Sequence, residues 1–464
     1  IYQKAPIVMR HLEMLLGEDT FRDGMREYLK DYAFGNATWT DLIALLDKRT
    51  PEDLAAWSTA WVDERGRPTI ATEFSVGTGQ SAVNTEGPFP VRVGISQKDP
   101  YEARGLRWPQ PLTVGGVFRE KAIVQRIRLD RDRVRVPLEG IPATQPLYVL
   151  PNWDGVGYGN FVLDPASRDY LLKNLHALDD ELRRGVVTVT LWEEMLDGRI
   201  EPKRMLDTLM RAVAVEPNEL SVQRMLGYTQ QAYWRWIPAN ERAALAPRLE
   251  ALLRSGLDTA KTPSLKSAWF NALRDVAVTN ETLAWLERVW SKAEDVPGLV
   301  LAEPDYITLA QELAVRGVPN AEKILQEQIA RTQNPDRKAR MIFVRPALSA
   351  DPQTRGAFFS RLTDPVNRRR EAWVLEGIGY IHHPLRAASA TQYVKPSLEM
   401  LREIQRTGDI FFPKRWMDAT LSGHTSPEVA RTVRAFLETL PPEYPERLRR
   451  IVLSSADDLF RVAK

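Results

Sequence analysis

The chain opens with Ile1-Tyr2-Gln3-Lys4-Ala5-Pro6, which leads into Val8-Met9-Arg10-His11-Leu12 and then Leu15-Leu16-Gly17. Apolar residues recur in it at the spacing of one helix face, and Gly17 is a typical residue at which a helix ends. A proline is tolerated only in the first turn of a helix, where Pro6 lies. This stretch therefore predicts an amphipathic helix that begins just after Tyr2.

Helical patterns continue to residue 66, so the sequence predicts four short helices over residues 3–66. Thr38-Trp39-Thr40-Asp41 has the pattern of a capping box, and Thr50-Pro51 predicts a second helix start, with Thr50 as its N-cap. Trp57 and Trp61 are four residues apart and are expected on one helix face.

The pattern changes at Thr69, where short β-prone runs follow one another with Gly and Pro between them. Runs of this kind predict a small antiparallel β-sandwich. The runs include Ile70–Val76, Val91–Val93, Leu112–Val114, Ile123–Val124, Ile127–Leu129, Val134–Val136 and Leu147–Leu150.

After Asp164-Pro165 the pattern is helical almost to the end of the chain. Paired helices joined by short loops over some three hundred residues predict a curved α-solenoid of the HEAT-like kind. The clearest helical segments are residues 166–181, 203–215, 239–254, 279–292, 318–331 and 426–439. We therefore expect a multidomain, mainly α protein.

Composition excludes several classes of function. The chain has 464 residues with a formal charge of +2, from 63 basic and 61 acidic residues that are mixed along it. A chain with this balance of charges is not expected to bind nucleic acid or an anionic membrane through its net charge. Cysteine is absent, which excludes thiolate catalysis and Cys-ligated zinc in this segment. No apolar run reaches the roughly 18 to 20 residues of a membrane helix.

Two motifs resemble the aminopeptidase N type of zinc aminopeptidase, a gluzincin family. They are Tyr2-x-Lys4 before the first helix and Tyr32-Ala33-Phe34-Gly35-Asn36-Ala37-Thr38. Residues 150–164 resemble the family's junction between sandwich and helical domain. Ala5 stands where the family usually has glycine, and Pro6 is unusual there. The resemblance implies three domains: residues 1–66 as the end of a thermolysin-like catalytic domain, 67–164 as the β-sandwich and 165–464 as a helical superhelix.

The resemblance implies a catalytic role for Tyr2. In this family a tyrosine phenol donates a hydrogen bond to the oxyanion that forms when zinc-activated water attacks the substrate carbonyl. A phenol has an unperturbed pKa of about 10 and remains protonated at neutral pH, so it can donate where negative charge develops. The alternative is that Tyr2 is a packing residue with a hydrated hydroxyl, which is the more common role of such a tyrosine.

The zinc ligands that the family requires are absent from the sequence. A gluzincin site takes two His from H-E-x-x-H and a Glu from the next helix, and this chain contains no such motif. Its five histidines are His11, His176, His382, His383 and His424. His11 is expected at an interior or boundary position and His424 beside a helix start. Neighbouring side chains such as His382 and His383 point apart, so a surface or helix-end pair is expected.

Three further motifs have simpler explanations than catalysis. Gly155-Val156-Gly157-Tyr158-Gly159 precedes an apolar run and not a helix, so we expect turn glycines and no nucleotide site. Glu193 and Glu194 are adjacent and cannot share a helix face as an acid and base pair; one is expected partly buried and one solvated. Arg368-Arg369-Arg370 is expected at a solvated helix start.

The sequence therefore predicts the C-terminal part of a zinc-dependent aminopeptidase that removes N-terminal residues from peptides. The helical domain would cap the substrate chamber, and the chain alone would bind no zinc and be inactive. The alternative is a non-catalytic peptide-binding or scaffold module, because helical solenoids commonly bind partners on a concave surface. Side-chain specificity, compartment and oligomeric state stay open.

Overall fold

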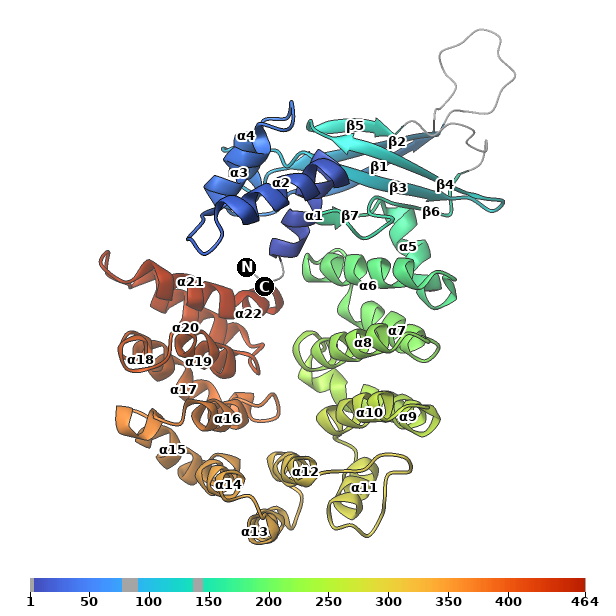
Figure 1. Cartoon of the computed structure of the whole chain (residues 1–464). Coiled ribbons are helices and arrows are strands. Elements are labelled where there is room, and N and C mark those ends of the chain that lie inside the picture. Colours follow the sequence, from blue (N-terminus) through green and yellow to red (C-terminus); the bar gives the residue numbers. More distant parts are fainter. Residues whose placement is uncertain (1–3, 77–90, 137–144, 464) are drawn as a thin grey trace. The chain divides into compact units, whose positions relative to one another are not determined.

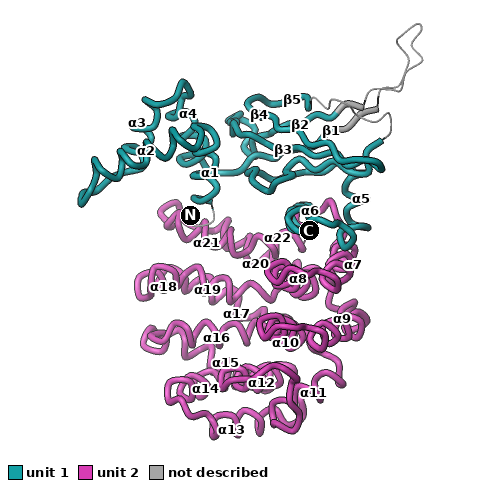
Figure 2. Tube along the Cα trace, turned by 45° about the vertical axis from the view of Figure 1, so that its right-hand side comes forward, with its two compact units in different colours: residues 1–195 teal, residues 196–464 magenta. Residues whose placement is uncertain are grey.

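A computed structural model describes residues 4–76, 91–136 and 145–463. The chain divides into two compact units, residues 1–195 and residues 196–464 (Figure 2). The mainly helical class with small sheets toward the N-terminal end, predicted from the sequence, is confirmed (Figure 1). The division into residues 1–66, 67–164 and 165–464 stays a prediction.

The first unit begins with the four predicted helices. They are α1 (Lys4–Leu16), α2 (Glu18–Asp31), α3 (Trp39–Asp47) and α4 (Leu54–Ser58), which continues into the π-helical turn η1 (Thr59–Asp63). The capping box of α3 is present, because the Asp41 amide donates to Thr38 and the Thr38 amide donates to Asp41. The predicted cap at Thr50 is wrong. Asp53 caps α4 instead, accepting a hydrogen bond from the Ala56 amide at 2.8 Å, because residues 51 and 52 form a bend.

Two small sheets follow, with strand orders β5-β2-β1-β7 and β4-β3-β6. Their bounds are β1 (Thr69–Val76), β2 (Val91–Lys98), β3 (Gln110–Val117), β4 (Ala122–Leu129), β5 (Arg133–Val136), β6 (Tyr148–Leu150) and β7 (Asn160–Val162). The two apolar runs at 123–124 and 127–129 belong to one strand, β4. The sheets are antiparallel except that β7 pairs in parallel with β1, with Ile70 opposite Phe161.

A shared core joins the sheets of the first unit. Its buried side chains include Ile70, Ile95, Leu112, Val114 and Leu129. They alternate along their strands with less buried positions, as the period of two requires. The strands that carry these residues coincide with the β-prone runs from which the sandwich was predicted.

The first unit ends with α5 (Pro165–Asn174), the 3₁₀ turn η2 (Leu175–Ala177) and most of α6 (Glu181–Leu196). Asp164 caps α5 by accepting from the amides of Ala166 and Ser167. The helix predicted over residues 166–181 ends earlier, at Asn174.

The second unit is a stack of helices. Its elements are α7 (Pro202–Val213), α8 (Glu219–Gln231), η3 (Ala232–Trp236), α9 (Ala239–Thr259), α10 (Pro263–Val276), α11 (Asn280–Trp290), α12 (Glu303–Val315), α13 (Ala321–Arg331), α14 (Pro335–Leu348), α15 (Pro352–Arg361), η4 (Pro365–Arg368), α16 (Glu371–Ile381), α17 (Ala387–Glu399), α18 (Leu401–Thr407), α19 (Phe412–Leu421), α20 (Pro427–Glu438), α21 (Glu446–Ser455) and α22 (Asp457–Val462).

These helices pack as pairs, which confirms the predicted solenoid. The second helix of one pair packs on the second helix of the next, so that α8, α10, α12, α14, α16, α19 and α21 form one inner row. The other members, such as α7, α9 and α11, lie outside this row (Figure 1). Contacts between pairs that follow one another along the chain dominate the described part of this unit, as expected of a quasi-one-dimensional architecture.

The last helix of the second unit contacts the first helices of the same unit. Arg235 in η3 forms an ion pair with Asp458 in α22. Arg461 donates to the Leu196 carbonyl at 2.9 Å and lies 3.2 Å from Asp197. The row of helices therefore turns back on itself, and segments more than two hundred residues apart in the sequence lie in contact.

Arg316, at the C-terminal end of α12, is a buried guanidinium that fixes the end of α10. Its side chain is 1% exposed. It donates to the carbonyls of Arg274 at 2.9 Å and Asp275 at 2.8 Å, and also to that of Ala277. Glu312, one turn earlier on α12, is its ion-pair partner.

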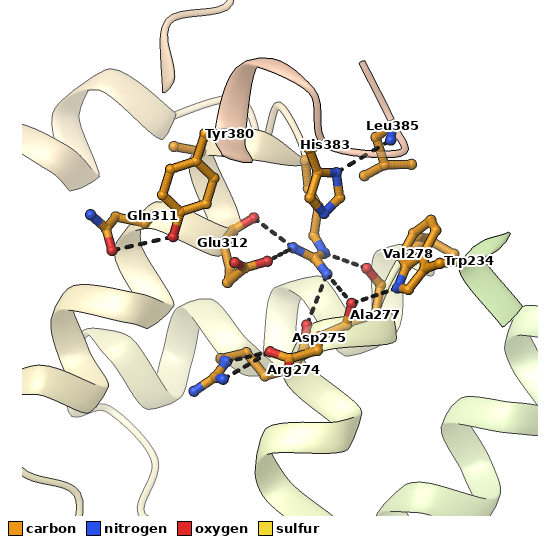
Figure 3. A network of polar contacts seen from close by, with 12 residues as sticks. Trp234, Arg274, Asp275, Ala277, Val278, Gln311, Glu312, Tyr380, His383 and Leu385 are labelled. Carbon is orange, nitrogen blue, oxygen red and sulfur yellow. Dashed lines mark hydrogen bonds and ion pairs between the residues drawn. The ribbon is translucent and has the colours of Figure 1, made fainter. Parts of the chain in front are cut away.

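Other polar groups complete this network (Figure 3). The Trp234 indole donates to the Asp275 carbonyl at 3.1 Å, and the Tyr380 hydroxyl contacts Gln311 at 3.3 Å. Burial, with the charges of Arg316 and two other arginines, lowers the pKa of the His383 imidazole to about 3. The last carbonyls of a helix have no partners within it, so Arg316 and Trp234 supply the donors that those of α10 need.

The basic run at 368–370 differs from its prediction. It precedes α16, as expected for a helix start, but Arg368 is 3% exposed and not solvated. Its guanidinium donates to the carbonyls of Leu362 and Thr363 and pairs with Glu403, 35 residues away. The pairing with a distant carboxylate explains why an arginine can be buried here.

His382 and His424 form a buried contact in the second unit, with the His382 Nδ1 2.8 Å from the His424 Nε2. His382 directly follows the last residue of α16, which confirms the helix-end alternative of its prediction; its side chain is 1% exposed and therefore does not lie at the surface. The turn that carries His424 lies so close to the His382 carbonyl that a Cβ on Gly423 would be 1.7 Å from that oxygen. Only glycine fits at this approach.

We expect replacement of Arg316 by methionine to lower the free energy of unfolding of the second unit by about 3–5 kcal/mol, because it leaves Glu312 and the α10 carbonyls buried without their donor. Urea unfolding followed by circular dichroism measures the change. Arg345→Met is the control. Its side chain is 42% exposed and forms one ion pair, so a loss of at most about 1 kcal/mol is expected. Equal losses in both variants would show that the network is not stabilising.

We expect stability to fall as the pH is lowered through about 6.5 toward 4, because the unfolded histidines then bind protons that the folded pair does not. Burial lowers the pKa of His424 to about 4 and that of His382 further below its ordinary value. His424→Gln should reduce the slope of unfolding free energy against pH by up to about 1.4 kcal/mol per pH unit. His176→Gln, at an exposed position, is the control. An unchanged slope in His424→Gln would contradict this.

Candidate functional site

Tyr2 lies outside the described residues, so the part of the candidate site that can be described is the helix that follows it. α1 starts at Lys4, two residues after Tyr2. Its position is set by contacts with the loop at residues 152–159 and with the tryptophans of α4 and η1. These contacts decide how firmly the N-terminal end of α1 is held.

Lys4 is the first described residue of α1 and lies against Tyr158. Its Nζ is 5.2 Å from the centre of the Tyr158 ring, within the range of a cation–π contact. Partial burial lowers the pKa of the Lys4 ammonium and raises the pKa of the Tyr158 phenol. The contact connects the first turn of α1 to the loop between β6 and β7.

His11 attaches the next two turns of α1 to the same loop. Its Nε2 is 2.9 Å from the Val156 carbonyl. Because a carbonyl only accepts hydrogen bonds, Nε2 carries the proton. Burial lowers the pKa of His11, and the bond to Val156 opposes that shift in part. His11 is 1% exposed, which confirms its predicted interior position and gives it a structural role.

Aromatic rings surround His11. The His11 and Trp61 rings are 4.7 Å apart, and Trp61 lies 5.5 Å from Tyr158. Trp57 stacks on Trp61 at 5.6 Å, so the two tryptophans share a face as predicted. Buried aromatic rings of this size lose much contact area if α1 moves, which makes the helix a rigid element of the unit.

The loop that holds α1 is shaped by its own hydrogen bonds and glycines. Asn152 accepts from the Gly157 amide at 2.8 Å, and Asp154 accepts from the Val156 amide at 3.2 Å. Gly155 has a φ of +72°, which favours glycine. The loop then enters β7 and not a helix, so these glycines serve turns, and the nucleotide-loop pattern has no structural support here.

The second family-like motif forms the connection between α2 and α3. Phe34 in it has a φ of +59° and a fully exposed side chain. A bulky residue in this region of backbone space is uncommon and costs on the order of 1–3 kcal/mol. Helix propensity therefore does not account for the backbone conformation of Phe34 or for the exposure of its ring.

A cavity of about 320 Å³ lies beside α1, between it, helix α4 and strands β3 and β4. Met14, Leu15, Trp57 and Ile127 supply its apolar part, and Arg126 and Arg128 supply charge. Arg128 pairs with Glu52. No acid and base pair suited to peptide hydrolysis stands among its described lining residues.

The paired glutamates of α6 have separate structural roles, as expected. Glu194 is fully buried, accepts from the Leu163 amide at 2.8 Å and pairs with Arg168. Glu193 is 27% exposed and pairs with Arg67. The two carboxylates therefore hold the end of the sandwich to α5 and α6.

The residues present do not fit a zinc ion. Within residues 4–76, 91–136 and 145–463, no three His, Asp or Glu side chains lie together so that they could hold a metal. His11 bonds a carbonyl, His382 and His424 contact each other, and His176 is exposed. The His382–His424 contact was missed from the sequence because 42 residues separate the two. Nor does any described helix have the length and apolar character to cross a membrane.

Two protein families match separate parts of the chain. The ERAP1-like C-terminal domain matches residues 148–459, and the Peptidase family M1 domain matches residues 1–61. Aminopeptidase N of Streptomyces lividans is 25% identical over 328 residues, which are 68% of this chain and 37% of that protein.

Tricorn protease-interacting factor F2 of Thermoplasma acidophilum is 23% identical over 414 residues, which are 83% of this chain and 49% of that protein. Aminopeptidase M1-B of Oryza sativa is 35% identical over 69 residues, or 15% of this chain and 8% of that protein. The chain thus spans half or less of the length of these relatives. With the M1 domain matched at its start and the helical C-terminal domain over most of its length, the chain belongs to the M1 aminopeptidase family and corresponds to its C-terminal portion.

Proposed function

We propose that this chain is the C-terminal part of a zinc-dependent aminopeptidase that removes N-terminal residues from peptides. The observation that carries the proposal is the M1 peptidase match over residues 1–61, which contains Tyr2 and α1. The similarity to an aminopeptidase N across two thirds of the chain supports the same activity. The zinc ligands and the general base are assigned to sequence outside these 464 residues.

Tyr2 is the residue to which we assign a catalytic role. Its phenol would donate a hydrogen bond to the oxyanion that develops on the substrate carbonyl, where a donor held in place is most effective. The contacts of Lys4 with Tyr158 and of His11 with Val156 support this role, because they hold the helix that begins two residues later. The positive end of the α1 dipole adds to the stabilisation of negative charge near its start.

The helical second unit is assigned a capping role over the substrate chamber of the complete enzyme. Its inner row of helices, α8 to α21, supports this role because a curved stack of helix pairs offers a concave face. Such a cap would admit short or unfolded peptides and exclude folded proteins.

We expect Tyr2→Phe in the full-length protein to lower kcat roughly 10²–10³-fold, since the substitution removes one donor to the oxyanion. Zinc content, measured by mass spectrometry, should stay that of the wild type, and KM should change little. Tyr101→Phe is the matched control, because Tyr101 is a half-exposed surface residue far along the sequence from α1. Wild-type turnover in Tyr2→Phe would refute the assigned role.

The purified 464-residue chain should neither retain stoichiometric zinc after dialysis nor hydrolyse aminoacyl p-nitroanilides. Turnover that is abolished by a chelator would contradict this. If the full-length protein were also inactive and its upstream sequence held no H-E-x-x-H, the alternative of a non-catalytic peptide-binding or scaffold module would be favoured instead.

A further inference from the structure

A groove of about 440 Å³ runs between α8 and α10 in the second unit. Both helices belong to the inner row of the stack, and they pack directly on each other (Figure 1). The lining combines small or apolar residues with three side-chain amides, two serine hydroxyls and one carboxylate. The lining residues are Gln223, Leu226, Gly227, Gln230, Ser264, Ser267, Ala268, Asn271, Ala272 and Asp275.

Two hydrogen bonds across the groove, from α8 to α10, are long, whereas Asn271 and Asp275 are also bonded by Arg274 at 2.9 Å. The Gln223 amide lies 3.4 Å from the Ser264 hydroxyl, and the Gln230 amide lies 3.4 Å from Asp275. Distances this long are at the limit of a hydrogen bond, so a ligand could replace these contacts at little cost. Glutamine and asparagine amides offer both donors and an acceptor, which is the combination that a peptide main chain presents.

Gly227 keeps the groove open. It lies in the interior of α8, where glycine costs about 1 kcal/mol relative to alanine. A Cβ at Gly227 would have no atom within 4 Å, so packing does not require glycine at this position. Ala268 and Ala272 on α10 are also small. A side chain at position 227 would enter space that is now free.

The polar side chains of α10 form one stripe along the groove, from Ser264 to Asp275. At about 1.5 Å per residue the stripe is about 16 Å long, which equals about five residues of extended chain at about 3.3 Å each. The far end of α10 is held by Arg316 and Trp234, so the stripe is presented on a fixed element (Figure 3).

Other ligand classes fit this groove less well. None of its described lining residues is Lys or Arg, and the nearby Arg274 guanidinium is already paired with the Asp275 carboxylate, so phosphate groups would meet a negative charge and no unpaired cation in the lining. None is aromatic, so bases would find no ring on which to stack. A purely apolar ligand would bury the amides without partners, which is costly.

We propose that the groove between α8 and α10 binds an extended polypeptide segment of about five residues through its main chain. Gln223, Gln230 and Asn271 supply the donors and acceptors, and Gly227 leaves room for the backbone to approach. The groove would then select extended, unfolded segments with little regard to their side chains. This inference deepens the proposed function by giving peptides a binding site on the helical unit. It does not depend on Tyr2 or on hydrolysis.

The test uses the 464-residue chain and a probe peptide without charged ends, an acetylated and amidated nonapeptide of serine, valine and threonine. Calorimetric titration should show saturable binding with a dissociation constant below about 1 mM. The same peptide with N-methylated main-chain nitrogens should bind at least roughly tenfold more weakly, because it lacks the N–H donors. No binding of the parent peptide, or equal binding of the N-methylated form, would overturn the proposal.

Gly227→Leu places a side chain in the groove and should weaken peptide binding at least roughly tenfold, while its Tm stays equal or rises because leucine favours helix. Gly185→Leu is the matched control. It lies within α6, and a Cβ there also meets nothing within 4 Å, but it does not line the groove. Equal affinity of the two variants would overturn the proposal.

Asn271→Asp tests the amide without changing its shape. The Arg274 guanidinium donates to the Asn271 Oδ1 at 2.9 Å, a contact that a carboxylate keeps. The variant should therefore fold but bind the peptide several-fold more weakly, because the NH₂ donors are lost. Unchanged affinity would refute a role for this amide.

Tighter binding of a neutral oligosaccharide than of the peptide would overturn the proposal that the ligand of the groove is a peptide. Peptide binding by a full-length protein without aminopeptidase activity would refute the proposed function but not this inference.

Discussion

The buried guanidinium of Arg316 is the interaction on which the arrangement of the helical unit depends. It reaches from the end of α12 to the last carbonyls of α10 and so connects two successive members of the inner row. A charge with 1% exposure is tolerated because Glu312 balances it and several carbonyl oxygens accept hydrogen bonds from its N–H groups. The groove beside α8 takes its shape from the helix that this interaction holds.

In the first unit the position of α1 is fixed in a comparable way, but there by aromatic side chains and by the hydrogen bond of one histidine. His11 is fixed by the Val156 carbonyl on one side and Trp61 on the other, and Lys4 lies over Tyr158. These contacts hold α1 to the loop after β6. The described part of α1, from Lys4 to Leu16, is therefore held on a rigid scaffold.

Much of the fold could be predicted because its signals are local. The capping box at Thr38, the strand alternation around Ile70 and the proline-led start of α5 each depend on residues a few positions apart. Errors arose where two local signals competed. Thr50-Pro51 has the pattern of a helix start, yet Asp53 provides the cap because its carboxylate reaches the Ala56 amide. The candidate catalytic residue rests on motif resemblance, since no local physical signal separates a catalytic tyrosine from a packing one.

The sequence by itself determined the order of elements, the mainly helical class, the missing zinc motif and the likeness to M1 aminopeptidases. Tertiary structure alone decided that β7 joins β1 in parallel, that Arg368 is buried against Glu403 and that His382 meets His424. It also decided that an open groove lies between α8 and α10, with Gln223, Gln230 and Asn271 among its lining residues. The physical reason is distance along the chain. The periodic patterns of helices and strands act over a few residues, whereas these contacts join distant segments that meet only when each unit has folded.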